Sequence, residues 1–219
     1  MKKTIEITMP ESWAEITLRQ YLDLSKELEN YKEDEDASTA VLLYKLCGLD
    51  PDVLNSISST TYNVLKSDLA KFMNITEMPL QRIINIDEKE YGFEPNLSQI
   101  SYGAYADISK YDTIQIDDNW AKIMSILYRP LLKKHLDTYS ITPYDGKIDN
   151  DLFLDVTMDI HFGALFFFVH LSTDLLVYTL NSTMATGVAQ LYNTISLKNG
   201  NPTQQLLNSQ MEILQKLMK

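Results

Sequence analysis

The chain has 219 residues, of which 45% are hydrophobic and 22% charged, so its composition is that of a globular protein and excludes a wholly disordered chain. The formal net charge of −11 argues against binding of free nucleic acid, because the densest basic group holds only Arg129, Lys133, Lys134 and His135. Cys47 is the only cysteine, which excludes an intramolecular disulfide and favours a reducing compartment.

The first third of the chain is predicted to hold one strand and four helices. Polar and apolar residues alternate over 3–9, the period of a half-buried strand. Thr17 can cap a helix whose apolar stripe reaches Leu28. The acidic run 33–36 is interpreted as a solvated loop, with a cation site as the less favoured alternative. The other helices are expected at 37–47, ended by Gly48, from Pro51 after the cap Asp50, and at 62–73.

The rest of the chain is also predicted to be largely helical. Residues 82–87 are strand-like, 88–92 resemble a turn, and 140–150 form a loop rich in turn residues. Helices are expected at 102–111, at 119–128 before Pro130, and over a long stretch from 151 to about 182. The fold class predicted from these elements is therefore mainly α with a small β element.

An internal duplication is suggested by two segments that lie 84 residues apart. Residues 16–26 and 100–110 share five identities in eleven positions, and 42–45 falls on 126–129 at the same spacing. This pattern predicts two equivalent strand–helix–helix units, 1–80 and 81–139, with Tyr21 and Tyr105 in equivalent places. Asp23 and Asp107 each follow the tyrosine by two positions, so we expect them to bond neighbouring structure rather than to act in catalysis. With a core helix region at 151–185, the units would form one domain over 1–198.

The apolar segment from Ile160 to Val169 is interpreted as a core helix rather than a membrane span. Asp159 and Asp174 bracket it, and the distance between them is shorter than the roughly 20 residues that a spanning helix needs. No export signal is recognised at the N-terminus, where Glu6 interrupts any apolar run.

Motifs that carry chemistry are not recognised in the sequence. His161 and His170 are nine positions apart, so one straight helix cannot direct both to a single metal ion. The spacings of zinc, calcium, phosphate-loop and nucleophile-elbow motifs do not occur. A polar site of Asp159, His161 and Asp174 can be imagined, but a core histidine with satisfied partners is favoured. We therefore expect no catalytic residue, no metal and no cofactor, although a site assembled in space stays open.

The C-terminal segment 203–219 is predicted to form an amphipathic helix after the break at 199–202. Its apolar stripe makes it the candidate protein-contact element, and a short helix of this kind must be buried somewhere. Two alternatives stay open, since the helix can fold back on its own domain or dock on a neighbouring protein. The stripe consists of Leu207, Met211, Leu214 and Met218.

Four segments together resemble proteins from the structural-gene clusters of tailed bacteriophages, which are described as tail-assembly-chaperone-like or as virion proteins. Two of them are 10–21 (Pro-Glu-Ser-Trp-Ala-Glu-Ile-Thr-Leu-Arg-Gln-Tyr) and 46–54 (Leu-Cys-Gly-Leu-Asp-Pro-Asp-Val-Leu). The other two, 123–131 (Ile-Met-Ser-Ile-Leu-Tyr-Arg-Pro-Leu) and 163–168 (Gly-Ala-Leu-Phe-Phe-Phe), are similar above all to podovirus-like gut phages of the crAss-like group.

This resemblance implies a role in building the phage particle, and it implies no active-site residue. The function expected first is that of a non-enzymatic virion structural protein of the capsid–portal–tail region, which contacts other phage structural proteins. Contact with further copies of the same chain, in a homo-oligomer, is an additional alternative. A second expectation is an assembly chaperone that is absent from the mature particle, and a third is a phage enzyme with an unrecognised site. The expected locations are the virion and, during assembly, the host bacterial cytoplasm, with neither nucleic acid nor membrane as a direct partner.

Overall fold

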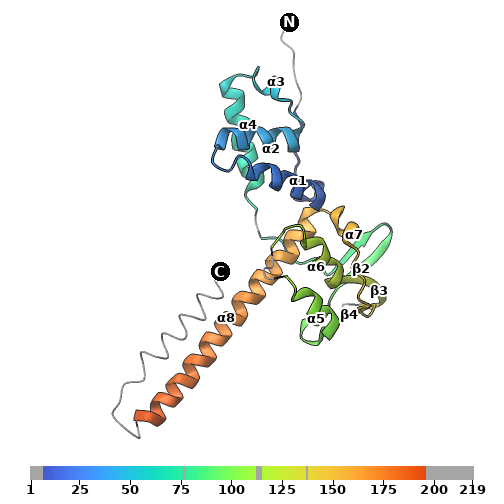
Figure 1. Cartoon of the computed structure of the whole chain (residues 1–219), viewed down its shortest axis with the longest axis vertical. Coiled ribbons are helices and arrows are strands. Elements are labelled where there is room, and N and C mark those ends of the chain that lie inside the picture. Colours follow the sequence, from blue (N-terminus) through green and yellow to red (C-terminus); the bar gives the residue numbers. More distant parts are fainter. Residues whose placement is uncertain (1–6, 76, 112–114, 137, 196–219) are drawn as a thin grey trace. The chain divides into compact units, whose positions relative to one another are not determined.

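The computed structural model describes residues 7–75, 77–111, 115–136 and 138–195 (Figure 1). The chain divides into two compact units, Met1–His170 and Leu171–Lys219. The predicted C-terminal helix and the predicted domain boundary at 198 lie outside the described residues, and both stay predictions. Everything that positions the candidate site belongs to the first unit.

The N-terminal part of the first unit contains four helices that follow their local sequence signals. They are α1 (Leu18–Glu29), α2 (Glu35–Cys47), α3 (Pro51–Leu54) and α4 (Ser59–Met73). Thr17 and Gln20 form a reciprocal capping box at the start of α1, and Gly48 ends α2 in the left-handed conformation with φ 63°. The acidic run was predicted as a loop, but Asp34 caps α2, and Glu35 and Asp36 form its first turn, where negative charge is favourable. Leu43, Leu49 and Leu69 form a small core among these helices.

A four-stranded antiparallel sheet follows, with its strands in chain order. Its strands are β1 (Ile83–Ile86), β2 (Lys89–Phe93), β3 (Tyr128–His135) and β4 (Thr138–Ile141). Together with eight α-helices in the described residues, this sheet makes the fold a mixed α/β one. The predicted class, mainly α with a small β element, is therefore wrong.

The predicted strand at 82–87 corresponds to β1, whereas β2, β3 and β4 were missed because local rules are broken around them. The β1–β2 turn holds Asp87 at φ 48° and Glu88 at φ 64°, where hairpin turns ordinarily carry Asn-Gly or Asp-Gly. Pro130 lies inside β3, a central strand, where proline is unusual because it donates no ladder hydrogen bond. The register of β3 on β4 also shifts between Leu131 and Lys133, so the period-two pattern is lost.

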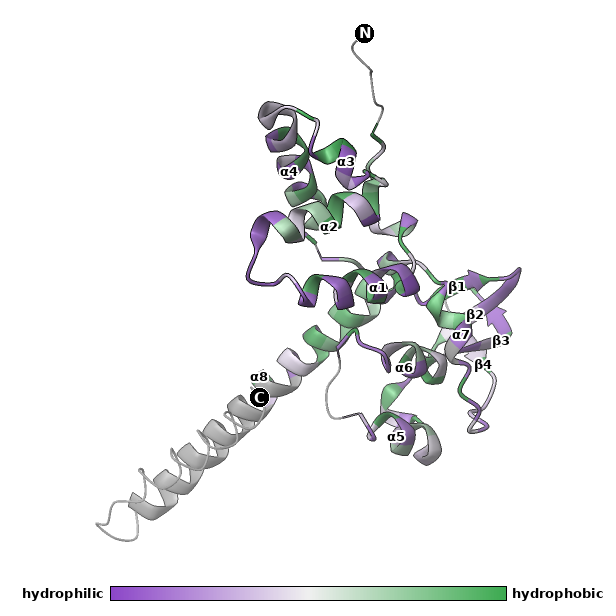
Figure 2. Ribbon diagram, turned by 45° about the horizontal axis from the view of Figure 1, so that its top comes forward, coloured by the Kyte–Doolittle hydropathy of each residue, from purple (hydrophilic) through white to green (hydrophobic). Residues whose placement is uncertain are grey.

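The main core of the unit lies between the sheet and the later helices. These are α5 (Tyr102–Ile108), α6 (Trp120–Leu127), α7 (Asn150–Leu154) and α8 (Met158–Ile195), whose first turns belong to this unit. All residues of α6 except Lys122 are buried, which makes α6 the most enclosed helix of the described part of this unit. Phe162 of α8 is buried in the same core, whereas Phe166, Phe167 and Phe168 are half-buried. Figure 2 shows the first turns of α8 in the green of apolar residues and the outer ends of the hairpins in purple.

The predicted duplication of equivalent strand–helix–helix units is also wrong. Short 3-10 helices at Trp13–Glu15 and Leu97–Gln99 and the helices that follow them do recur 84 residues apart. However, residues 7–9 form no strand, and the two tyrosines have unrelated surroundings. Tyr21 is half-buried against Trp13 and Phe162, whereas Tyr105 is 58% exposed. The repeated sequence thus reflects similar helix caps, Thr17 and Ser101, rather than a repeated packing unit.

Candidate functional site

The first unit contains a pocket of about 340 Å³ where α6 passes directly into β3. One wall comes from β2, β3 and the end of α6, and the other comes from the segment 142–149 and from α7. The pocket therefore joins residues that are distant in the sequence. Its lining comprises Tyr91, Ser125, Tyr128, Arg129, Pro130, Thr142, Pro143, Tyr144, Asp145, Lys147, Asp149, Leu152 and Phe153.

The segment 142–149 is fixed against α5 by one strong hydrogen bond. The Tyr144 hydroxyl donates to Asp107 Oδ2 at 2.5 Å, and Lys110 Nζ contacts Asp107 Oδ1 at 2.5 Å. Burial, together with the hydrogen bond to Asp107, raises the pKa of Tyr144 to about 12, and Lys110 and Tyr144 lower the pKa of Asp107. The expectation that Asp107 bonds neighbouring structure is confirmed. Asp23 likewise accepts a hydrogen bond from Lys45 Nζ of α2, at 2.7 Å.

Aromatic rings form much of the pocket wall. The ring of Phe153 contacts those of Tyr91 and Tyr128, with centroid distances of 6.3 Å and 6.0 Å. Tyr128 is buried and its hydroxyl donates to the Gln81 carbonyl oxygen at 2.6 Å, so its ring is held in place. Such walls can accept an apolar stem, and their ring faces can attract a cation.

Three of the four charged side chains that line the pocket have an ionic partner among the described residues. Arg129 is buried and Nη2 donates to Glu94 Oε2, while the Arg129 Nε has no partner among the described residues. Lys147 Nζ lies 3.3 Å from Asp145 Oδ2, and the Lys147 backbone N–H, followed by the side chain, lowers the pKa of Asp145. Asp149 caps α7 by accepting from the Leu152 N–H, and no basic side chain of the described residues pairs with it. The pocket is thus left with one uncompensated carboxylate.

The polar site imagined at Asp159, His161 and Asp174 is a set of separate structural contacts. His161 is fully buried, where Nδ1 accepts from Trp120 Nε1 at 3.1 Å and Nε2 lies 3.2 Å from the Phe153 carbonyl oxygen. Asp159 accepts from Thr157 and Gln81. Asp174 is exposed and belongs to the second unit.

The basic group noted in the sequence is also divided by the fold. Arg129 is internal, Lys134 Nζ lies 3.2 Å from Glu90 Oε1, and Lys133 has no acidic partner among the described residues. Near Lys133, Leu132 is 58% exposed, and on α5 Tyr102 is 84% exposed. Sequence reasoning missed the pocket and the exposed Leu132, because both depend on strands that it did not predict, and it missed the exposure of Tyr102 because that depends on how α5 packs.

Comparisons of the chain with protein-family models, with curated proteins and with solved structures give no match. Within the described part of the chain, no three His, Cys, Asp or Glu side chains converge on a point that could hold a metal ion. None of the helices in that part combines the length and hydropathy needed to cross a bilayer. The predicted contact residues Leu207, Met211, Leu214 and Met218 lie outside the described residues.

Proposed function

We propose that this chain is a non-enzymatic structural protein of a bacteriophage virion, in the capsid–portal–tail region, where it acts through contacts with other structural proteins. The observation that carries the proposal is the exposure of large aromatic side chains on α5. Tyr102 and Tyr105, three positions apart and therefore on one face of the helix, are 84% and 58% exposed. Tyrosine is enriched in protein interfaces, where its ring is buried while its hydroxyl keeps a hydrogen bond.

Two further observations support this proposal. The sequence resembles tailed-phage structural proteins over most of residues 1–185, and the resemblance carries no active-site residue. In addition, the buried histidine uses both of its ring nitrogens in holding the core, since they face Trp120 and Phe153. A structural role for His161 agrees better with a contact protein than with an enzyme.

A protein census of purified phage particles tests the proposal. We expect the chain at a fixed copy number relative to the major capsid protein, measured by quantitative mass spectrometry, with a host cytoplasmic protein as the contamination control. Absence of the chain from particles, despite its presence in infected cells, would support the assembly chaperone instead.

The tyrosines themselves can be tested in the same census. The double substitution Tyr102→Ala and Tyr105→Ala should change the free energy of unfolding by less than about 0.5 kcal/mol, because exposed side chains contribute little to stability. It should nevertheless reduce incorporation into particles. Tyr31→Ala on the connection between α1 and α2, where the side chain is 41% exposed, is the matched control and should be incorporated normally.

A further inference from the structure

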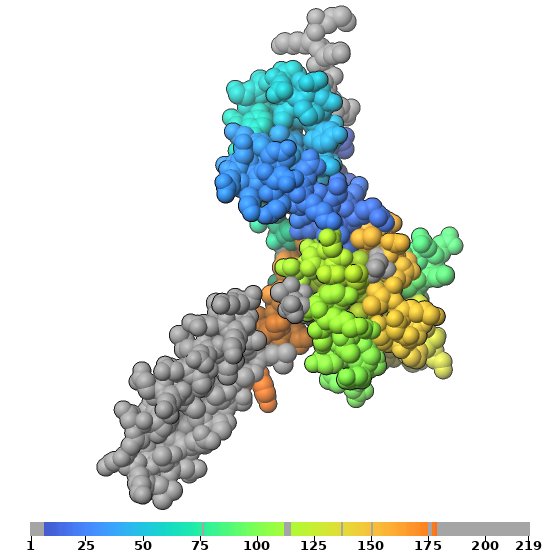
Figure 3. Space-filling model, in the orientation of Figure 1, coloured from blue at the N-terminus to red at the C-terminus, as the bar shows by residue number. Residues whose placement is uncertain are grey.

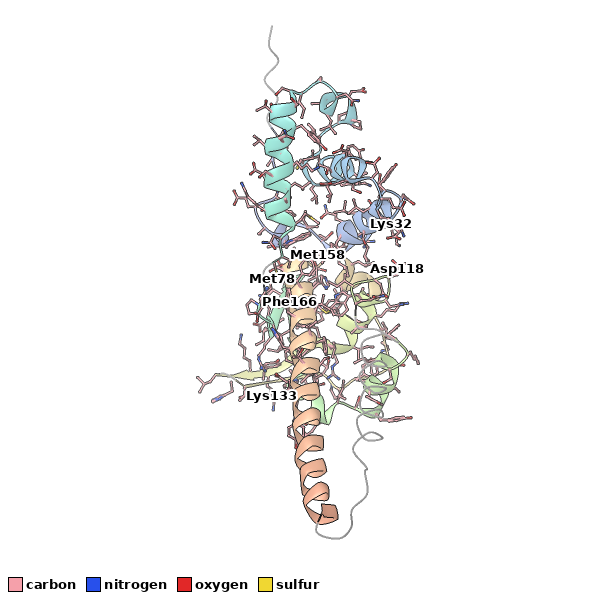
Figure 4. All side chains as sticks on the ribbon, turned by 90° about the vertical axis from the view of Figure 1, so that its left-hand side faces the viewer. Lys32, Met78, Asp118, Lys133, Met158 and Phe166 are labelled. Carbon is pink, nitrogen blue, oxygen red and sulfur yellow. The ribbon has the colours of Figure 1, made fainter. Side chains whose placement is uncertain are left out.

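The outer part of the β3–β4 hairpin presents an apolar and a basic side chain side by side. From Leu132 to Leu136 every residue of β3 and the turn is exposed, so neither face of the strand is covered. Leu132 falls at the register shift between Leu131 and Lys133, and such a bulge redirects the side chains around it. Figure 4 shows Lys133 on the strands that project away from the helices of the unit. A two-stranded hairpin with both faces in water is marginal by itself, so a partner on this surface would stabilise it.

The pocket at the base of the same hairpin has the complementary chemistry. After the pairs Arg129–Glu94 and Lys147–Asp145 are formed, Asp149 keeps a negative charge that no basic side chain in the described part of the chain pairs with. The rings of Tyr91 and Phe153 come from the two opposite walls and contact each other in the same pocket, and the charge of Asp149 contributes, after burial, to the raised pKa of Tyr91. Such a site suits a lysine side chain, whose methylene stem packs on the rings while its ammonium group reaches the carboxylate.

We propose that the pocket of one copy of this chain receives Lys133 from the β3–β4 hairpin of a second copy, with Leu132 packing on the rim formed by Pro130 and Pro143. The distribution of charge on this chain favours a second copy of it as the occupant of the pocket. The molecule carries −11 overall, and Lys133, Lys134 and His135 make the outer part of this hairpin its densest exposed basic segment. Another copy offers this segment the Asp149 carboxylate, which has no basic partner among the described residues. This inference rests on the proposed function, because it names one contact through which a structural subunit would assemble.

The contact joins two different surfaces, the outer part of one hairpin and the pocket at the base of the next, so it is heterologous. Heterologous contacts continue from copy to copy and produce rings when the rotation closes, or filaments when it does not. Because the contact includes an ion pair near the surface, high salt should weaken it.

The experiment uses the purified full-length chain, with association measured by sedimentation velocity at low and at high salt over a range of protein concentrations. The wild-type chain should associate with rising concentration, and more weakly at high salt. Lys133→Gln and Asp149→Asn should each raise the dissociation constant at least about tenfold, as expected for loss of a charged pair. Asparagine is as good a helix cap as aspartate, so Asp149→Asn removes the charge while α7 keeps its cap. The matched control is Lys89→Gln on the neighbouring β1–β2 hairpin, which should associate like wild type.

Mixing the two variants distinguishes this contact from other ways of associating. The Lys133→Gln chain keeps an intact pocket, and the Asp149→Asn chain keeps an intact hairpin. An equimolar mixture should therefore form mixed dimers that do not extend, although each variant alone stays monomeric. Equal thermal melting of all variants would show that folding is unchanged.

Three results would overturn the inference: a wild-type chain that stays monomeric at the highest concentration, variants that associate as wild type does, or a mixture without mixed dimers. These outcomes are separate from the particle census. A chain found in virions that does not associate by itself would refute this contact alone, and an associating chain absent from virions would refute the proposed function alone.

Discussion

At the scale of single residues, His161 joins three parts of the core through its two ring nitrogens. The indole N–H of Trp120 can only donate, so Nδ1 must accept, and the proton of the neutral ring lies on Nε2, facing the Phe153 carbonyl oxygen. This arrangement connects α6, α7 and α8. Burial disfavours the charged ring and lowers its pKa from 6.5 to about 4, against the opposing effect of the carbonyl groups.

The pKa of His161 predicts a stability that depends on pH. Between pH 6.5 and about 4 the unfolded chain binds a proton at this residue and the folded chain does not. The contribution of His161 to the free energy of unfolding is therefore fully present above pH 6.5 and is lost as the pH falls through this window. The free energy of unfolding should fall by about 2 kcal/mol between pH 7 and pH 5. Urea unfolding at the two pH values measures it. His135→Gln, at an exposed histidine, should keep the dependence and His161→Gln should reduce it. An unfolding free energy that stays the same at both pH values would contradict the neutral, buried ring.

At the scale of the elements, α8 packs backbone to backbone on the segment before β1. A Cβ atom added at Gly163 would lie 2.6 Å from the Pro79 carbonyl oxygen, a distance that real side chains essentially never show. Glycine is thus required here by the close approach of another chain segment. The same residue contributes to the segment 163–168 that carries part of the phage resemblance.

Gly163→Ala is expected to destabilise the protein by about 1–3 kcal/mol, because the cost of overpacking exceeds the gain in helix propensity. Gly103→Ala in α5 is the matched control, since its added Cβ would meet the Tyr144 ring at an ordinary 3.5 Å. That variant should be unchanged or more stable by up to about 1 kcal/mol. Thermal melts of the two variants give the comparison, and equal destabilisation of both would show that the Pro79 contact is not what restricts residue 163.

Sequence reasoning located the elements whose determinants are local. Thr17, Gly48 and the Asp50-Pro51 pair set helix ends through bonds to their own neighbours, so four consecutive residues suffice to recognise them. Beyond the strand-like segment 82–87, the sheet was not predicted, because Pro130 and the β1–β2 turn are tolerated only through cross-strand pairing, which no local window contains. The pocket depends on that pairing as well, since it joins residues 91–153. The structural roles of Asp23, Asp107 and His161 were anticipated, those of the two aspartates from their position two residues after a tyrosine.

At the scale of the whole molecule, the hydrophobic core of the described residues is complete before the first unit ends. Its fully buried members run from Trp13 to Ala164, and the half-buried rings of α8 that pack on them end at Phe168. The unit boundary after His170 lies two residues beyond that point. A long helix can therefore extend into the second unit while the folding of the first depends on its initial turns.

This arrangement predicts that a chain ending after His170 folds cooperatively, with a melting temperature within a few degrees of the full-length protein. This chain keeps every described residue of the main core, and its shortened α8 keeps the turns that carry the buried Phe162 and Ala164. A chain ending after Asp159 is the control. It lacks His161 and Phe162, and removing one buried phenylalanine alone costs about 3–5 kcal/mol, a large part of the stability of a typical domain. Circular dichroism melts and proteolysis of the two truncations provide the measurement.

If the chain ending after His170 is unfolded as well, residues 171–219 supply stability to the first unit. If it is folded, those residues, including the predicted contact stripe from Leu207 to Met218, are free to serve assembly, and loss of particle incorporation by the folded truncation would then assign them that role.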